Sequence, residues 1–298
     1  MEKSTQKEEV KYGVNKAHIH GYIDSLVVFK NEGGNQHAAL ANVTSIGDTY
    51  TNKEGKQIKE RDHHRIKILI TDADLKAYEQ IAADCKEKAA NKGVDGFEPK
   101  NHTITLDNAR MVNEDRKFDK ESDETYKAVQ FLVTDPKNVK LDTPQEKGAQ
   151  RNWVELQGNV GRLHVDQEHK LANGSVCINY RPKEGEEQKT WVNFSVDGKN
   201  PYAAAAFKAM SQAEVGDKVG FKGRMVDDGF DPQNRTKRGD KIEVISGRVL
   251  LKKQDQKQAV EQAAAQKQEQ KPAPKPVQTP VEKPAQTQKR TPNKGRKM

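Results

Sequence analysis

Alternation of apolar and polar residues is clearest at positions 152–163, which read NWVELQGNVGRL. Val154 and Leu156 fall on one side of an extended chain, and polar residues lie between and beyond them. This period of two predicts a β-strand with one buried face. Gly158 and Gly161 interrupt the pattern, as expected where a strand bends or bulges at the corner of a barrel.

The same pattern of residue types occurs near the N-terminus, where positions 15–26 read NKAHIHGYIDSL. Asn15, Gly21 and Leu26 each precede a residue of the same type by 137 positions. On that offset the following strand of the first copy, at 39–43, aligns with 176–180. A repeat of this length indicates a duplicated domain rather than a solenoid, whose units span tens of residues.

Each copy contains the same series of predicted elements. The first has strands near 17–29, 38–45, 65–71, 102–112 and 126–134, a turn-rich hairpin loop at 47–56, and a helix that Asp72 or Asp74 caps and that closes near Gly93. The second has strands at 152–163, 175–181, 190–197, 215–226 and 242–251, and a short helix that Pro201 opens and that carries Tyr202.

Five strands with a helix between the third and fourth is the order of an OB barrel. The predicted fold class is therefore mainly β, with two tandem five-stranded OB barrels. We expect a first OB-like domain at 13–135, a linker at 136–151, a second OB-like domain at 152–253, and a disordered tail at 254–298.

Charge is distributed unevenly along the chain. The tail at 254–298 contains ten Lys or Arg and four Asp or Glu, so it holds +6 of the net charge of +8. The folded part is therefore close to neutral, and only the tail is strongly cationic. The N-terminus lacks the apolar core of a signal peptide and no run could span a bilayer, so we expect a cytoplasmic protein without membrane contact.

Signals for catalysis are weak. There is no phosphate-binding Gly-x-x-x-x-Gly-Lys-Ser/Thr loop, and Cys85 and Cys177 lack zinc spacing, so both are expected to be buried free thiols. The run Asp62-His63-His64 could suggest a metal site with Asp72 and Asp74. Adjacent histidines on a strand point to opposite faces, however, and helix capping explains the two later aspartates. We therefore expect no enzyme activity, no cofactor and no metal.

A tryptophan on the polar face of a strand is the main candidate for ligand contact. Val192 and Phe194 fill one face of the strand at 190–197, which leaves Trp191 and Asn193 on the face where OB folds receive ligands. Stacking of a base on an aromatic side chain is worth roughly 1–3 kcal/mol. The alternative is that Trp191 plugs the end of the barrel. Trp153 also lies on a polar face, where it either contacts ligand or is covered by the next strand.

Cationic residues near the second barrel could contact phosphates. The loop after its fourth strand combines an aromatic residue with three cations, although such a loop is more often merely solvated. Arg162 and Arg181 are weaker candidates. In the first copy, aligned through its isoleucines, Arg65 takes the position of Trp191, and Lys67 follows it. The loop after the fourth strand of the second barrel contains Phe230, Arg235, Lys237 and Arg238.

These motifs occur in an order that resembles the bacterial single-stranded DNA-binding protein family. The first copy has the opening motif GVNK, which includes Lys16. The second copy matches in more places: Asn152 with Gly158-Asn159-Val160-Gly161, Asn173-Gly174 with Asn179-Tyr180, Lys189-Thr190-Trp191, and Gly216-Asp217-Lys218-Val219 with Gly223-Arg224.

The resemblance implies sequence-nonspecific binding of single-stranded DNA in replication, recombination, repair or mobile-element transfer in a bacterial cytoplasm, in association with the nucleoid. It also implies a base-stacking role for Trp191 and a homodimer that assembles four barrels. Because Arg65 and Lys67 stack less well than tryptophan, the first barrel is expected to bind more weakly or to serve as a packing partner.

Two departures from the family pattern leave other functions open. Asp197-Gly198 stands where the family has an aromatic residue before glycine, and the tail ends in KGRKM instead of an acidic tip, so partner recruitment by such a tip cannot be carried over. The alternatives are an adaptor that has lost nucleic-acid binding and binds other proteins, and an OB protein that binds RNA.

Overall fold

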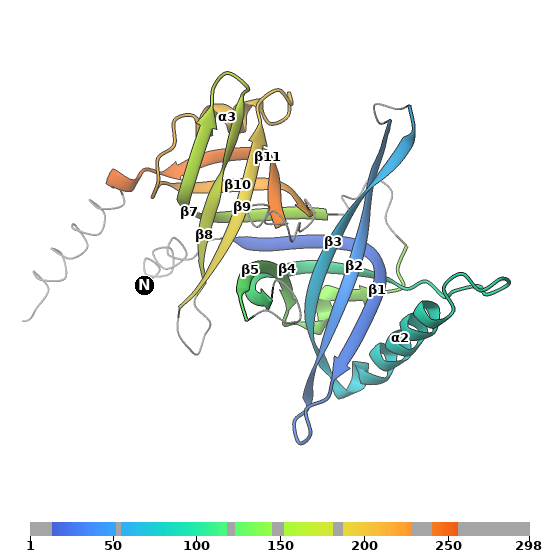
Figure 1. Cartoon of the computed structure of the whole chain (residues 1–298). Helices are drawn as coiled ribbons and strands as arrows, with labels where there is room; N and C mark the ends of the chain where they lie inside the picture. Colours follow the sequence, from blue (N-terminus) through green and yellow to red (C-terminus); the bar gives the residue numbers. More distant parts are fainter. Residues whose placement is uncertain are drawn as a thin grey trace, which may run out of the picture. The chain divides into compact units, whose positions relative to one another are not determined.

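The computed structural model describes residues 14–51, 55–117, 123–144, 152–180, 187–227 and 240–255, all within one compact unit. This part of the chain is built mainly from β-strands, which form two OB barrels in tandem (Figure 1). The predicted fold class is confirmed. No helix in the described ranges is long and apolar enough to cross a membrane.

The first barrel follows the predicted order of strands with a helix between the third and fourth. Its elements are β1 (Asn15–Phe29), β2 (Gln36–Thr51), β3 (Gln57–Thr71), α2 (Asp72–Ala90), β4 (Thr103–Lys117) and β5 (Thr125–Val133). A 3-10 turn, η1 (Pro136–Asn138), and β6 (Val139–Leu141) follow, and β6 pairs with β4. Part of the segment predicted as a linker therefore forms an additional strand beside the first barrel.

The second barrel repeats this order with shorter elements. They are β7 (Asn152–Asp166), β8 (Leu171–Tyr180), β9 (Gln188–Asp197), α3 (Ala204–Met210), β10 (Lys218–Asp227) and β11 (Asp240–Leu251). In each barrel a short parallel pairing connects the third strand to the fifth, β3 to β5 and β9 to β11.

Period-two alternation places the core inside each barrel. Ile66, Ile68 and Ile70 of β3 are fully buried, and Val192 and Phe194 are nearly so in β9. The intervening residues of both strands point outward, because successive side chains of a strand face opposite sides. The outer faces of the third strands are therefore available for contacts.

The helix of the first barrel begins with a capping box. Thr71 is the N-cap, and Asp74 at the third helical position accepts hydrogen bonds from the hydroxyl and the backbone N–H of Thr71. Asp72 instead receives a hydrogen bond at 2.7 Å from His37. Cys85 is buried on the inner face of the helix, as predicted.

Three predictions about local structure were wrong. The hairpin loop predicted at 47–56 begins later, because β2 continues to Thr51 and β3 begins at Gln57. The short helix begins at Ala204, and Tyr202 lies in the preceding turn with 80% of its surface exposed. Cys177 is a free thiol but only partly buried, because it points outward from β8.

The two barrels are joined by strand pairing with approximate two-fold symmetry. β1 and β7 run antiparallel, and Ala17 pairs with Val154, its own counterpart in the repeat. Asn15 pairs with Leu156, and Ile19 pairs with Asn152. The first strands of the repeats therefore form one continuous sheet across the barrels.

The repeat offset of 137 applies to the first strand only. The bulge after Ile23 faces Val43, and the bulge after Val160 faces Val176, so the second strands correspond at an offset of 133. The turn between the first two strands is four residues longer in the first barrel, since Phe29 pairs with Ala38 whereas Asp166 pairs with Leu171. The predicted match of 39–43 with 176–180 was therefore wrong by four residues.

Candidate nucleic-acid interface

The outer side of β1, β2 and β3 forms a surface of four cross-strand rows, here called the first-barrel face. Residues directly opposite each other in neighbouring strands point to the same side. The rows are Phe29, Ala38 and Leu69; Val27, Leu40 and Lys67; Ser25, Asn42 and Arg65; and Tyr22, Thr44 and His63.

Aromatic and apolar side chains lie at the two ends of the first-barrel face, and cations lie between them. Phe29 is 55% exposed, Val27 52% and Tyr22 42%, so three large exposed side chains lie on one face. Lys67 is exposed and Arg65 half-buried in the two middle rows. Exposed rings with interleaved cations are what a single strand of nucleic acid requires, because bases stack and phosphates need positive charge.

Glu114 orients the arginine of this face. Its carboxylate lies 3.3 Å from Nε of Arg65, pairs with Arg116, and accepts a hydrogen bond from Gln130 at 2.7 Å. The carboxylate partly neutralises both guanidinium groups. Phosphates on the first-barrel face would therefore meet Lys67 as its most exposed cation.

The equivalent rows of the second barrel, here called the second-barrel face, carry different chemistry. These four rows contain two basic side chains, those of Arg162 and His164. The acidic side chains of Asp166 and Asp197 lie in the row at one end. The rows are Asp166, Leu171 and Asp197; His164, Asn173 and Ser195; Arg162, Ser175 and Asn193; and Asn159, Cys177 and Trp191.

Trp191 is held as a platform at the other end of the second-barrel face. Its ring covers Gly161 at the bulge of β7, so closely that a Cβ on this glycine would overlap the ring. Its backbone makes two hydrogen bonds with the Asn113 side chain of β4, at 2.6 and 2.9 Å. The side chain remains 47% exposed, so it does not plug the barrel end.

Other predicted residues are more dispersed. Asn193 and the exposed Arg162 share a row next to that of Trp191. Trp153 is half-buried and pairs with His18 where β7 meets β1, and the exposed Lys16 lies opposite Glu155 in the same pairing. A separate group lies outside the described residues: Arg181, Phe230, Arg235, Lys237 and Arg238.

The predicted equivalence of Arg65 and Trp191 was wrong by two residues. Cys177 pairs with Trp191, and its counterpart Thr44 pairs with His63. His63 therefore takes the position of Trp191, and Arg65 takes that of Asn193.

Sequence reasoning missed Phe29 and Tyr22 as candidates. Both occur in β1, where the alternation of Ile23 and Leu26 with exposed neighbours is broken by the bulge between Ile23 and Ser25. Phe29 could have been identified by counting alternate, outward-facing positions of β1 back from the turn between β1 and β2. Tyr22 required knowledge of the bulge.

An ionic group connects β10 of the second barrel with β3 of the first, and its Asp62 is buried. Arg224 of β10 pairs with Glu60 of β3 and lies 3.9 Å from Asp62, which is 5% exposed. Burial raises the pKa of Asp62, although Arg224 and a hydrogen bond from Asn152 oppose that effect. At the equivalent place in the first barrel, the guanidinium of Arg110 lies over the Tyr180 ring at 3.6 Å.

The architecture defined by these observations is a tandem pair of OB barrels whose outer faces carry exposed aromatic side chains. A deletion mutant of the single-stranded DNA binding protein from Thermus aquaticus has a similar fold, with a TM-score of 0.50 and 15% identity over 81% of this chain and 97% of that one. The wild-type Thermus aquaticus protein is also similar, with a TM-score of 0.45 and 16% identity over 80% and 93% of the two chains. No protein-family model matches the sequence, and no curated protein matches it at a significant level.

Proposed function

We propose that this protein binds single-stranded DNA along the first-barrel and second-barrel faces, and that it does so without a strong sequence preference. The first-barrel face carries the proposal, because two exposed rings, Phe29 and Tyr22, flank Arg65 and Lys67 on adjacent rows. Stacking is tolerant of sequence since every base has a π-face. The fold shared with a single-stranded DNA binding protein supports the same function.

Both barrels contribute to DNA binding, but to different extents. The first-barrel face offers an apolar and cationic track, whereas the second-barrel face offers one strong platform, Trp191, and an acidic end at Asp166 and Asp197. The first barrel is therefore the broader binding surface, and the second barrel adds a single stacking site. Cellular roles in replication, recombination, repair or mobile-element transfer follow from holding single strands.

Tryptophan fluorescence during titration with an oligo-dT tests the proposal. The chain has only two tryptophans, so a Trp153→Phe variant assigns the signal to Trp191. We expect strong quenching that weakens as salt is raised, since phosphate contacts release counterions. Quenching should persist when the chain ends at Lys253. Loss of all binding on removal of the tail would reduce the role to loose electrostatics and contradict the proposal.

An adaptor for other proteins is the second candidate function. The exposed side chains of Phe29 and Val27, with the half-buried Leu40 beside them, could instead pack on a protein. The acidic end of the second-barrel face opposes phosphate binding. Absence of binding to both oligo-dT and oligo-U would favour this candidate. Tighter binding to oligo-U than to oligo-dT would favour RNA as the ligand.

We also propose that two chains associate to assemble four barrels. Sedimentation at micromolar concentration, with and without oligo-dT, measures this directly. A monomer mass under both conditions would disprove it.

A further inference from the structure

The backbone of β9 at Trp191 has a strand neighbour on one side only. On the side of β8, Trp191 lies opposite Cys177. On the side of β11, the parallel pairing begins two residues later, with Asn193 opposite Lys241. Within the described part of the chain, β11 therefore offers no pairing partner at the residue that carries the stacking ring.

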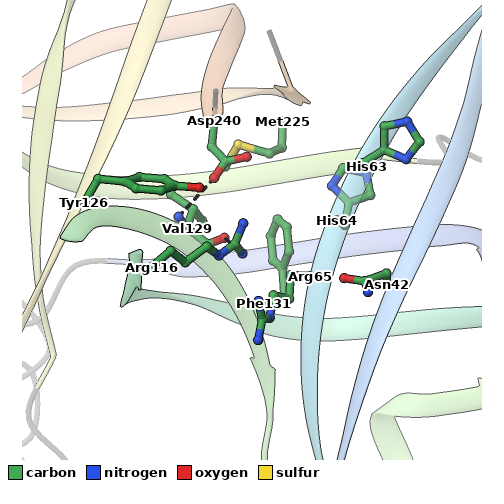
Figure 2. Close-up of a pocket in the computed structure, with 10 residues that line it drawn as sticks. All are labelled: Asn42, His63, His64, Arg65, Arg116, Tyr126, Val129, Phe131, Met225 and Asp240. Atoms are coloured by element: carbon green, nitrogen blue, oxygen red, sulfur yellow. Dashed lines mark hydrogen bonds between the residues drawn. The ribbon is translucent and has the colours of Figure 1, made fainter. Parts of the chain in front are cut away.

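One row of the first barrel takes the place of that partner. Asn113 of β4 and Val129 of β5 lie directly opposite each other in this row. Oδ1 of Asn113 accepts a hydrogen bond from the backbone N–H of Trp191 at 2.6 Å, and Nδ2 donates to its carbonyl oxygen at 2.9 Å. The backbone N–H of Val129 donates to the carboxylate of Asp240, the first residue of β11, at 3.1 Å (Figure 2). A single row of the first barrel therefore binds both strands of the second barrel just before they pair.

The amide of Asn113 reproduces the bonds of a paired strand. In an antiparallel ladder, two residues of a hydrogen-bonded pair exchange both of their N–H···O bonds. A side-chain amide has a carbonyl acceptor and two N–H donors, so it can supply the same two bonds from one short group. The backbone of Trp191 is therefore paired, but with a residue of the other barrel.

Further contacts connect β4 with the same pair of strands. The hydroxyl of Thr190 donates to the carbonyl oxygen of Met111 at 3.4 Å. The guanidinium of Arg110 lies over the ring of Tyr180, the last residue of β8, at 3.6 Å. The strands that carry the stacking ring thus rest on β4 at several neighbouring residues.

The ring has a second support, which comes from its own barrel. Gly161 of β7 lies so close to the Trp191 ring that a Cβ would overlap it. This contact limits the ring on one side but does not hold the backbone of β9. Side chains occupy a few staggered rotamers, so the direction of the indole follows the position of its backbone. Gly161 and Asn113 therefore restrain the ring in different ways.

We propose that Asn113 is a positioning residue of the DNA-binding surface, which fixes Trp191 from the first barrel in an orientation that allows a base to stack. The inference rests on the proposed function and makes the second-barrel face depend on the first barrel. β4 also pairs with β1 beside an exposed ring of the first-barrel face, since Tyr22 lies opposite Thr103. The same strand therefore connects the two faces.

A double-mutant cycle on the full chain tests the proposal. Fluorescence anisotropy of labelled oligo-dT at fixed salt compares the wild type, Asn113→Ala, Trp191→Ala and the double variant. Asn113→Ala should weaken binding about 3- to 10-fold, a part of the roughly 5- to 150-fold that one stacked base supplies. In the Trp191→Ala background the same substitution should change affinity by less than about twofold, because no ring remains to be positioned.

The emission of Trp191 gives a second measurement, in the absence of DNA. A Trp153→Phe background leaves Trp191 as the only tryptophan. Asn113→Ala should lower the anisotropy of its emission, because the ring gains motion. Asn113→Asp keeps the shape of the side chain and the acceptor for the Trp191 N–H but loses the donor. Its added charge acts with or without the ring, so a larger loss of affinity in the presence of Trp191 isolates the positioning effect.

Asn15→Ala is the matched control. Asn15 makes the same pair of amide bonds with the backbone of Met111 in β4, at 2.8 and 2.9 Å. Its removal should lower stability, as removal of Asn113 does, but should leave the emission of Trp191 unchanged and oligo-dT affinity within about twofold. A loss of affinity equal to that of Asn113→Ala would show that any loosening of β4 displaces the ring, and would overturn the specific role of Asn113.

The other outcomes separate the two proposals. Equal losses from Asn113→Ala with and without the Trp191 ring would overturn the inference, since the amide would then act elsewhere. Unchanged affinity and unchanged emission anisotropy in Asn113→Ala would overturn it as well. Wild-type affinity in Trp191→Ala would end the inference and leave the first-barrel face as the binding surface. Absence of binding of oligo-dT to the wild type would instead contradict the proposed function.

Discussion

Phe29 and Trp191 are exposed rings at opposite ends of equivalent faces of the two barrels. Neither is explained by packing, since Phe29 leaves 55% and Trp191 47% of its surface in solvent. Trp191 is supported by Gly161 beneath it, and Phe29 lies beside Ala38 and next to the row of Leu40. Small or apolar neighbours hold each ring while leaving one side open to a base.

Replacement of either ring by alanine is expected to weaken oligo-dT binding by about 5- to 150-fold, from the roughly 1–3 kcal/mol of one stacked base. Fluorescence anisotropy with labelled oligonucleotide measures the loss. Tyr202→Ala is the matched control, because Tyr202 is 80% exposed but belongs to neither face. An equal loss in the control would show that the effect is not stacking.

The buried His64 should make stability depend on pH. Its pKa is lowered to about 3 in the folded protein, first by burial and then by His63, whereas an unfolded histidine titrates near 6.5. Between these values the unfolded state binds a proton that the folded state does not, so stability falls as pH falls through this window. The slope is at most about 1.4 kcal/mol per pH unit.

Urea unfolding at about pH 7 and about pH 5 measures the effect. His64→Phe should lose less stability than the wild type between the two conditions, because it removes the titrating group. The same substitution at the exposed His164 is the matched control. Parallel curves for wild type and His64→Phe would contradict the prediction.

At the scale of elements, the bulge of β7 positions the platform of the second-barrel face. Gly161 has no positive φ, so alanine fits its backbone, but the added Cβ would overlap the Trp191 ring. Gly161→Ala is therefore expected to displace the ring and to weaken oligo-dT binding to a similar degree as Trp191→Ala. The free energy of unfolding should change by less than about 1 kcal/mol, because a side chain rather than backbone moves.

Gly174→Ala provides the contrast. A Cβ there would meet the backbone oxygen of Arg162 and the ring of the buried Phe194, neither of which can move freely. We expect a clear loss of stability by thermal unfolding. A larger loss for Gly161→Ala than for Gly174→Ala would show that the Trp191 ring is not mobile.

Element order could be predicted from sequence because apolar and polar residues alternate over long parts of the barrel strands. Ile66, Ile68 and Ile70 identify the inner face of β3 without any structure, and Val192 with Phe194 does so for β9. Register could not be predicted in the same way. The turn after β1 is four residues longer than the turn after β7, and a repeat aligned on the first strand has no internal signal of that change. A separate error of two residues, made when the third strands were aligned through their apolar residues, placed Arg65 at the position of Trp191 and concealed His63.

The candidate site was predicted only in part for a related reason. Trp191 could be identified from the sequence of β9 alone, because alternation within this strand shows that the tryptophan points outward. The first-barrel face required three strands in register, and the support of Trp191 by Asn113 required a contact between β4 and β9. Such non-local pairings are set by tertiary packing, which single-strand patterns do not contain.

At the scale of the whole molecule, Arg224 is the charge that makes burial of Asp62 tolerable. Arg224→Met should lower the free energy of unfolding by about 2–3 kcal/mol, somewhat below the ~3–5 kcal/mol of a fully buried broken pair, because Arg224 is partly exposed. Without the guanidinium the pKa of Asp62 rises further. The penalty is then full above that raised pKa and disappears as pH falls below the unfolded value of 3.8.

Denaturant unfolding at neutral and acidic pH measures both effects. Asp62→Asn in the Arg224→Met background should restore most of the lost stability, because it removes the unpaired charge. Arg110→Met serves for comparison, since Arg110 lies over the Tyr180 ring instead of a carboxylate. A pH-independent defect in Arg224→Met would indicate lost packing rather than lost charge.

The pairing of Ala17 with Val154 resembles the axis of a homodimer, yet both sides belong to one gene. In a dimer of identical chains every mutation near the axis is made twice, and both copies must accept it. In this chain each half can change alone. Arg110 and Arg224 occupy equivalent positions and have acquired an aromatic and an acidic partner, respectively. Each half can therefore keep a side chain that the other lacks, as Trp191 in the second barrel and His63 at the equivalent position of the first barrel show.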